Sequence, residues 1–413
     1  MFASFIYNLS IAAYRLAVWV VGFFNAKARK LSQGERGALQ TLRNAIHPGE
    51  KYIWIHAASL GEFEQGRPLI EAIRHNNPKQ RILLTFFSPS GYEVRKNYNE
   101  VDVVSYLPFD TPHNVVEFLD IVQPQQAIFI KYEFWNNYLQ ELKKRNIPTY
   151  IISAIFRRSQ MFFKGKNNFF ARMLHCFTHI CVQDSNSVEL LKSIGIAKVT
   201  VAGDTRFDRV MSIMQQRRDL PLIARFANEH FTWVVGSSWE KDEELYIPYF
   251  NNRPEQRLII APHEIHEEHL THIEQMLKRP SLRLSQANET NIEQAECLII
   301  DSFGLLSSIY RYGKVAYIGG GFGAGIHNTL EAVVYGIPVL FGPRYKKFHE
   351  ACLMVQQGIA FPVLDANDVE KTMDRLEHDP LYLQLLGQKA TSFCNSLAGA
   401  TPRIYNDLFT SQS

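Results

Sequence analysis

The chain contains little cysteine, and its cysteines have none of the spacings that build a framework. Its 413 residues include five, an odd number with no Cys-x-x-Cys pair: Cys176, Cys181, Cys297, Cys352 and Cys394. Such a scatter is typical of a reducing compartment and argues against a disulfide scaffold or a cysteine-rich zinc site. Low-complexity tracts and internal repeats are also lacking, so the composition does not predict disorder.

What the chain does have is enough apolar material for more than one core. Hydrophobic residues make up 46% of it, and its length fits two domains of about 150–200 residues each. The net charge of +3 is uneven, because residues 1–205 carry 24 Lys and Arg against 16 Asp and Glu, and the remainder carries 20 against 25. Either this is chance, or the first half meets an anionic surface.

Residues 2–24 form an apolar run without the preceding basic residues of a secretory signal. Basic residues follow the run instead, at Lys27, Arg29, Lys30 and Arg36, which predicts an uncleaved anchor with the globular part in the cytoplasm. Ser4, Asn8 and Arg15 fall on one narrow stripe of a helix. Because Arg15 at a bilayer centre would cost at least about 2.5 kcal/mol, the run is either a helix half-sunk in the interface or a strained single span.

Beyond residue 48, β-rich apolar runs alternate with amphipathic stretches, which predicts an α/β protein with parallel sheets covered on both faces. The first series of predicted strands is 52–57, 81–87, 127–132, 149–152 and 179–182, and the second is 231–235, 257–261, 297–300, 315–318 and 339–341. In two open α/β sheets the functional crevice is expected at the carboxyl ends of the strands, between the domains.

The first predicted strand runs into Ala58-Ser59-Leu60-Gly61-Glu62 and then a helix. A strand–loop–helix junction brings Glu62 to the edge of the crevice, where a carboxylate can accept a proton from an attacking hydroxyl. On spacing alone, the better interpretation is a first-turn glutamate that complements the helix dipole.

A second junction is rich in glycine, at residues 319–325 (GGGFGAG), and is followed by residues 326–331 (IHNTLE). The backbone amides of Gly320, Gly321 and Gly323 predict a phosphate cradle in front of a helix that starts at once. The spacing fits neither the dinucleotide fingerprint nor the P-loop. Glu331 either holds ribose hydroxyls or is a solvated helix residue.

Two further segments invite a functional interpretation. The row His263, His266, His269 and His272 lacks the spacing of a zinc motif, so no metal site is predicted. Residues 157–172 interleave phenylalanines with basic residues that include Arg157, Arg158, Lys164 and Lys166. This mixture favours a membrane interface with anionic head groups over nucleic acid, or else it is a solvated loop.

Seven segments in order resemble the family of 3-deoxy-D-manno-octulosonic acid (Kdo) transferases, which move Kdo from CMP-Kdo onto a lipid A precursor. They are residues 55–62 (IHAASLGE), 107–112 (LPFDTP), 132–137 (YEFWNN), 201–208 (VAGDTRFD), 301–304 (DSFG), 327–331 (HNTLE) and 342–344 (GPR). The resemblance implies a GT-B fold, with two Rossmann-like domains facing each other across a cleft. The predicted divisions are an anchor helix (1–25), an acceptor-binding domain (26–208), a nucleotide-sugar domain (209–385) and a C-terminal helix (386–413) packed back on the first domain.

The resemblance also assigns site residues. It makes Glu62 the general base and Arg206 the basic residue before the Phe-Asp pair. It places the CMP contacts on Pro262, His263, Phe303, Gly304, Leu305, Asn328, Thr329, Leu330 and Glu331. The chain departs from the family at Lys131, where the family has a glutamate, and at His263 and Leu305. The role of that glutamate is lost, has moved to Glu133, or is served differently.

The activity that the resemblance implies is inverting transfer to lipid IVA at the cytoplasmic face of the inner membrane, without cofactor or metal. The predicted partners are the anionic lipid A precursor and the membrane leaflet, not nucleic acid. Two alternatives stay open: a GT-B transferase with another nucleotide sugar and lipid acceptor, and a catalytically idle membrane-bound scaffold. The number of Kdo units added and the oligomeric state are not predicted.

Overall fold

The computed structural model describes residues 2–165 and 168–410 and divides the chain into two compact units. Unit 1 comprises Met1–Arg209 and Ala398–Ser413, and unit 2 comprises Val210–Leu397. The chain therefore leaves unit 1 once and returns to it near its C-terminus. These divisions fall after residues 209 and 397, where the sequence predicts boundaries after 208 and 385.

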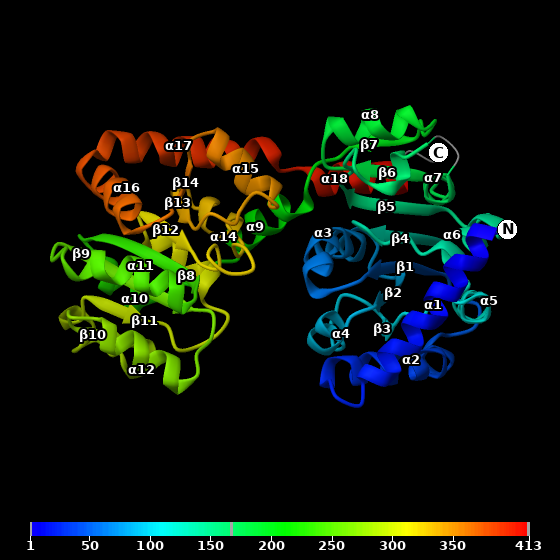
Figure 1. The fold of residues 1–413 in the computed structure, drawn as a ribbon, viewed down its shortest axis with the longest axis horizontal. Coiled ribbons are helices and arrows are strands. Elements are labelled where there is room, and N and C mark those ends of the chain that lie inside the picture. The colour runs from blue at the N-terminus through cyan, green and yellow to red at the C-terminus, as the bar shows by residue number, and fades with distance from the viewer. Residues whose placement is uncertain (1, 166–167, 411–413) are drawn as a thin grey trace. The chain divides into compact units, whose positions relative to one another are not determined.

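Unit 1 is built on a seven-stranded parallel sheet with the order β3-β2-β1-β4-β5-β6-β7 (Figure 1). Its strands are β1 (Tyr52–Ala57), β2 (Arg81–Phe86), β3 (Val103–Tyr106), β4 (Gln126–Ile130), β5 (Thr149–Ala154), β6 (His179–Val182) and β7 (Val199–Val201). All six residues of β1 are buried, because helices cover both faces of a parallel sheet. Trp54 belongs to the apolar cluster on one face, and Ile53 and Ile55 belong to the cluster on the other.

The helices of unit 1 include an N-terminal pair and a returning C-terminal segment. They are α1 (Phe2–Val21), α2 (Ala26–Ala45), α3 (Leu60–Asn76), α4 (Pro89–Arg95), α5 (Pro112–Val122), α6 (Asn136–Lys144), α7 (Phe169–Leu174), α8 (Ser185–Ser193), α9 (Thr205–Gln215), which continues into unit 2, α18 (Ala400–Tyr405) and a π-helical turn (Asn406–Thr410). Ile404 and Leu408 are buried in the same cluster as Ile53 and Ile55. The C-terminal segment therefore completes one face of the unit 1 core.

Unit 2 repeats the architecture with a parallel sheet in the order β10-β11-β9-β8-β12-β13-β14. Its strands are β8 (Phe231–Ser238), β9 (Gln256–Pro262), β10 (Ser281–Arg283), β11 (Cys297–Ile299), β12 (Val315–Ile318), β13 (Val339–Phe341) and β14 (Ala360–Pro362). Its helices are α10 (Pro221–Ala227), α11 (Glu240–Asn251), α12 (Glu267–Met276), α13 (Leu306–Ile309), α14 (Leu330–Val333), α15 (His349–Gln356), α16 (Ala366–His378) and α17 (Pro380–Leu397). The predicted α/β class with two parallel sheets is confirmed.

Candidate active site

Both sheets change winding direction at one point. In unit 1 this switch point lies between β1 and β4, and in unit 2 it lies between β8 and β12. Open α/β sheets bind ligands where the loops after two such strands diverge. Those loops carry Glu62 and residues 131–135 in unit 1, and Trp239 and the glycine-rich segment in unit 2. The sequence-predicted residues therefore gather at the two places where the topology leaves room for a ligand.

Glu62 lies in the first turn of α3, which begins directly after β1. Burial raises the pKa of Glu62 to about 7, and the negative charge of Glu133 adds to the rise, while Lys131 and the backbone N–H groups of Ala58 and Ser59 oppose it. Its Oε2 atom is buried and has no hydrogen-bond partner among the described residues. Glu62 therefore complements the helix start, and it also has the pKa and the available oxygen that a general base requires.

Glu133 is held by a buried chain of hydrogen bonds that starts on β1. Trp54 Nε1 donates to Thr85 Oγ1 at 2.8 Å, and Thr85 Oγ1 lies 2.9 Å from His56 Nδ1. His56 Nε2 lies 3.1 Å from Glu133 Oε2, which also accepts from Trp135 Nε1 at 2.7 Å. The contacts with His56 and Trp135 fix the position of the Glu133 carboxylate beside Glu62.

Cationic and phenolic groups surround this pair of carboxylates. Lys131 has a left-handed backbone, with φ of 68°, and its ammonium lies 5.4 Å from the centre of the Tyr132 ring. Burial raises the pKa of Tyr132, and the charges of Arg157 and Arg206 lower it. Arg206 donates to the Asp204 carboxylate from Nη2 at 2.6 Å. The structure thus brings Arg206 toward the Glu62 site, with its guanidinium bound to an acidic neighbour.

In unit 2, the rings of three residues pack together at the switch point. The ring centroid of His263 lies 4.4 Å from that of Trp239 and 4.5 Å from that of His327, at interplanar angles of 28° and 25°. Trp239 Nε1 donates to His327 Nε2 at 3.1 Å. Burial, with His263 nearby, lowers the pKa of His327 to about 4. The stack is therefore neutral at His327 and offers flat faces to an aromatic ligand.

The glycine-rich segment is folded by its own hydrogen bonds. Gly320 N–H donates to Asp242 Oδ2 at 2.8 Å, and Gly323 N–H donates to the Gly320 carbonyl at 3.0 Å. Two of the three amides predicted to hold phosphate are thus already engaged, and Asp242 would repel an anion at Gly320. A Cβ on Gly321 would lie 2.5 Å from the Gly342 nitrogen, so that glycine allows two backbones to pack. The helix that follows is also short, spanning only Leu330–Val333.

Two cationic side chains that contact the glycine-rich segment were not among the predicted site residues. Arg344 Nη1 donates to the Gly323 carbonyl at 2.6 Å, and Lys347 Nζ donates to the Ala324 carbonyl at 2.5 Å. Both side chains are exposed. They therefore add positive charge beside a loop in which two of the three predicted amides already donate hydrogen bonds. The predicted motif at residues 342–344 was the available signal, but the hydrogen bonds join residues 21 and 23 positions apart, which no local pattern reveals.

The other predicted nucleotide contacts differ in accessibility. Phe303 is 73% exposed, whereas the side chains of Thr329 and Leu330 are buried. Asn328 Nδ2 donates to Glu331 Oε1 at 2.8 Å. Thr329 and Leu330 can therefore offer a ligand little beyond their backbone, whereas Phe303 presents a ring. Of the remaining positions, Pro262 is the last residue of β9, and Gly304 and Leu305 follow β11 at the carboxyl ends of the strands.

A hollow of about 360 Å³ adjoins the glycine-rich segment. It is lined by Trp239, Glu240, Lys241, Asp242, Glu264, His266, His269, Phe322 and Gly323. Because it opens beside the ring stack and the loop, it has the position expected of a small-molecule pocket.

The basic and aromatic parts of residues 157–172 have separate roles. Arg157, Arg158 and Lys164 are exposed, and Lys166 lies outside the described residues. Phe162 is buried, and its ring lies 4.7 Å from that of Phe134, between centroids. Phe163, Phe169 and Phe170 pack against the unit 1 core. Phe162 therefore closes the core beneath a basic loop, and the other three rings are half-buried against that core. A membrane interface at this segment stays a prediction.

Histidines do not converge on a metal in unit 2. His269 Nε2 lies 2.9 Å from Glu243 Oε2, and His266 Nδ1 accepts from the His269 backbone at the start of α12. Among the described residues, one group of three possible ligands lies close together, His179, Cys181 and Asp407. His179 begins β6 and already bonds Thr200 Oγ1 at 2.8 Å. His179 lies at the amino end of its strand, whereas Glu62 follows the carboxyl end of β1.

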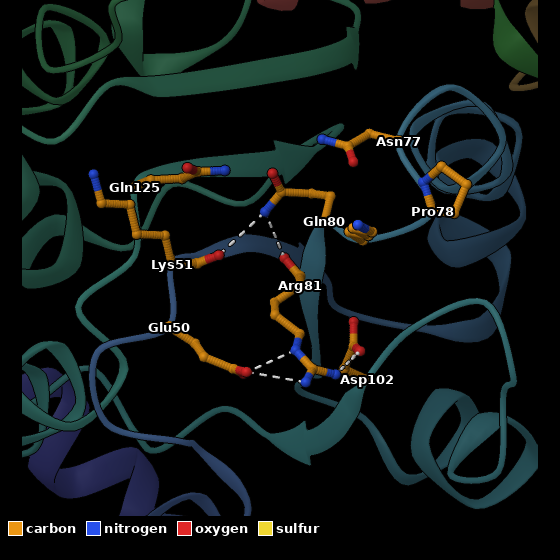
Figure 2. A pocket seen from close by; sticks show the side chains of 9 residues that line it. Glu50, Lys51, Asn77, Pro78, Gln80, Arg81, Asp102 and Gln125 are labelled. Atoms are coloured by element: carbon orange, nitrogen blue, oxygen red, sulfur yellow. Dashed lines mark hydrogen bonds and ion pairs between the residues drawn. The ribbon is translucent and has the colours of Figure 1, made fainter.

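A second hollow opens at the amino ends of β1 and β2 (Figure 2). Within its charged lining, Arg81 contacts Glu50 at 2.8 Å and Asp102 at 2.7 Å, and Lys51 and Lys79 are exposed. The hollow lies at the ends of the strands opposite the switch-point loops, away from the ligand position expected of an open α/β sheet.

Comparison with known proteins identifies this kind of molecule. By fold, the chain is similar to UDP-GlcNAc 2-epimerase of Neisseria meningitidis (TM-score 0.61, 13% identity, covering 87% of this chain and 100% of that one). It is also similar to MurG of Acinetobacter baumannii (TM-score 0.53, 9% identity, covering 86% and 98%). With the two parallel sheets described above, these likenesses show a GT-B fold.

The sequence comparison is more specific. Residues 30–209 match the family described as 3-deoxy-D-manno-octulosonic-acid transferase (kdotransferase). The enzyme of that name from Haemophilus influenzae is 25% identical over 417 residues, covering 98% of this chain and 97% of that one. The one from Aquifex aeolicus is 27% identical over 332 residues, covering 78% and 85%. These matches support the Kdo transferase family.

Proposed function

We propose that the protein transfers Kdo from CMP-Kdo to a sugar hydroxyl of a lipid A precursor, lipid IVA, with inversion at the anomeric carbon, at the cytoplasmic face of the inner membrane. Similarity to the Kdo transferases supports Kdo as the transferred sugar. The observation that carries the mechanism is Glu62, a half-buried carboxylate at the switch point of unit 1. Its pKa is about 7, and its buried Oε2 atom has no partner among the described residues.

In the proposed reaction, the acceptor oxygen attacks the anomeric carbon of Kdo and loses its proton to Glu62. The new carbon–oxygen bond forms as the bond from that carbon to the CMP phosphate oxygen breaks, and the electron pair leaves with CMP. Glu133 touches no reacting atom in this scheme. It keeps the pKa of Glu62 high, so that the base is matched to neutral pH.

The donor is assigned to unit 2. The Trp239–His263–His327 stack offers a surface for the cytosine ring, and Arg344 and Lys347 offer charge to the phosphate. Cations and fixed dipoles at a departing phosphate stabilise the charge that develops there. The predicted role of Arg206 stays part of the proposal, with Asp204 as its bound counter-ion.

The test is the Glu62→Gln enzyme in a transfer assay with CMP-Kdo and lipid IVA. Glu62→Gln should fold and bind CMP but lose at least about 100-fold in kcat, in line with the usual contribution of a general base. Glu71→Gln on the same helix, whose native carboxylate pairs with Arg67 at 2.7 Å, is the matched control and should keep normal turnover. Normal turnover by Glu62→Gln would remove Glu62 from the mechanism.

A competition experiment separates the donors. CMP should protect unit 2 against thermal unfolding and inhibit transfer, and UDP should do neither at the same concentration. Protection by UDP alone would favour another nucleotide sugar. Protection by CMP without any transfer would favour the idle scaffold.

A further inference from the structure

The outer face of α1 is an exposed apolar surface. Phe2, Phe5, Leu9 and Leu16 are 78%, 65%, 61% and 60% exposed, and Ile6 and Val20 lie beside them. At 100° per residue these positions fall within about 100° of one another on a helix. The helix is long and apolar enough to cross a membrane by length and composition. A continuous apolar stripe of this kind requires a partner.

The inner face of α1 is bound to unit 1 by polar contacts along the middle of the helix. Tyr7 Oη donates to Asp110 Oδ2 at 2.6 Å and accepts from the Asn136 backbone at 3.2 Å. Beside it, Asn137 Nδ2 donates to Asn8 Oδ1 at 2.8 Å, and Arg15 lies 3.8 Å from Glu35. Asn8 of the predicted polar stripe thus contacts protein, and Arg15, itself exposed, pairs with Glu35.

These contacts are incompatible with a spanning helix. Crossing a bilayer would remove Tyr7 from Asp110, which is 1% exposed, and would carry Asn8 and Arg15 into hydrocarbon. Buried polar groups that lose their partners destabilise a fold strongly, and charged side chains are disfavoured in a bilayer. We propose that α1 lies in the plane of a bilayer surface, with its outer face among the acyl chains and its inner face bound to unit 1.

The residues at and after the C-terminal end of α1 favour a bilayer with anionic head groups. Phe23 and Phe24, which follow the helix, are 60% and 90% exposed, and Trp19 is 42% exposed. Basic residues come next in the chain, at Lys27, Arg29, Lys30 and Arg36. Aromatic rings favour the head-group level, and lysine and arginine beside an apolar helix face favour anionic lipid.

The same arrangement makes α1 part of the acceptor site. Its contacts reach Asn136 and Asn137, which directly follow Trp135, and Trp135 holds Glu133. An acceptor that is itself a lipid of the same leaflet would therefore reach the site of Glu62 and Glu133 beside α1. This step rests on the proposed function, whereas the orientation of α1 can be measured without any transfer.

Helix depth tests the orientation directly. Nitroxide labels would be placed singly at Phe5→Cys, Leu9→Cys, Leu16→Cys and Val20→Cys in the full chain with Cys352→Ser, bound to phosphatidylethanolamine–phosphatidylglycerol vesicles. Residues 5 and 20 are about 22 Å apart along a helix axis. An in-plane helix gives the four labels similar depths within the outer leaflet. Depths that differ by about 20 Å, or that peak at mid-helix, would overturn the proposal.

Vesicle sedimentation tests the surface itself. Leu9→Glu with Leu16→Glu should weaken binding to the same vesicles at least about 10-fold, and Val116→Glu should leave it unchanged. Val116 is the matched control because it is an apolar residue, 41% exposed, on α5 and not on the outer face of α1. Neutral phosphatidylcholine vesicles should bind the unaltered protein more weakly. Equal binding by the Leu9/Leu16 variant, or equal binding to neutral lipid, would contradict the proposed surface or its anionic partner.

Discussion

At the residue scale, the two carboxylates of the unit 1 site differ in how they are held. Glu133 is fixed by His56 and Trp135, whereas Glu62 has a buried oxygen without a partner among the described residues. In the proposed mechanism, the fixed group sets an electrostatic environment and the available group exchanges protons. Under that proposal the site keeps a glutamate base with Lys131 at the position where the resemblance implies a further glutamate.

The pH dependence of transfer should follow Glu62. Because the pKa of Glu62 is about 7, the carboxylate becomes protonated as pH falls through 7, and a protonated group cannot accept the acceptor's proton. We expect kcat/KM to rise with pH up to a limb near 7 and then to level off. A limb near the ordinary glutamate value of about 4.3 would mean that Glu62 is not the titrating base.

Two neighbouring substitutions should move that limb in opposite directions. Glu133→Gln keeps hydrogen-bonding atoms but removes a negative charge, so the limb should move to lower pH by roughly 0.5–1 unit. Lys131→Met removes a positive charge, so the limb should move to higher pH by a similar amount. Full pH profiles of both variants check this prediction, and shifts of the same sign would contradict it.

Single residues also show where the sequence stops being informative. Glu62 could be predicted because a strand–loop–helix junction places it at the crevice. His56 could not, because the strand reads only as buried core, and its partner Glu133 is 77 positions away. The same holds for Arg344 and Lys347, whose contacts with the glycine-rich segment depend on the register of β12 beside β13.

At the element scale, the interior strands were predictable and the edge strands were not. β3, β7, β10 and β14 lie at the edges of the two sheets and are the strands that the apolar runs did not reveal. β10 and β7 have three residues each, partly or fully exposed, because an edge strand has one neighbour and little cover. Interior strands are buried on both faces and therefore read as continuous apolar runs.

The glycine-rich segment was predicted to bind phosphate, and a stability test can separate binding from packing. Gly321→Ala should destabilise unit 2 by about 1–3 kcal/mol, because the new Cβ meets the Gly342 backbone at 2.5 Å and backbone cannot give way cheaply. Gly323→Ala is the control, since its Cβ meets only a carbonyl at 3.6 Å. Thermal unfolding of both variants without ligand measures the difference, and equal melting temperatures would contradict the packing role.

The contact between α1 and residues 136–137 also predicts an effect on turnover. Tyr7→Phe removes the hydroxyl that joins Asp110 to the Asn136 backbone, which should cost about 1 kcal/mol or more of unfolding free energy. We expect kcat to fall several-fold while vesicle binding is retained, because the outer face of α1 is unchanged. Loss of vesicle binding with normal kcat would mean that Tyr7 serves anchoring alone.

At the scale of the whole molecule, unit 1 is discontinuous in sequence. Ile404 and Leu408 complete its core, so a chain that ends at residue 397 should leave apolar surface exposed on α3. We expect this truncation to unfold unit 1 at a lower temperature or to aggregate, whereas residues 210–397 alone should fold and bind CMP. Calorimetry of the full chain and both fragments measures this. Normal stability of the truncated chain would show that the C-terminal segment is dispensable.

The chain leaves unit 1 for unit 2 and returns to it at almost the same place. The Asp208 carboxylate accepts hydrogen bonds from Gly399 N–H at 2.5 Å and from Thr401 N–H at 2.6 Å, so the outgoing and returning segments are clasped together. A domain whose two ends lie together can be exchanged as one piece. Replacing residues 210–397 by the matching part of a relative that uses another nucleotide should change the sugar that is transferred and leave the proton acceptor Glu62 in place. Donor choice and acceptor chemistry can therefore evolve independently.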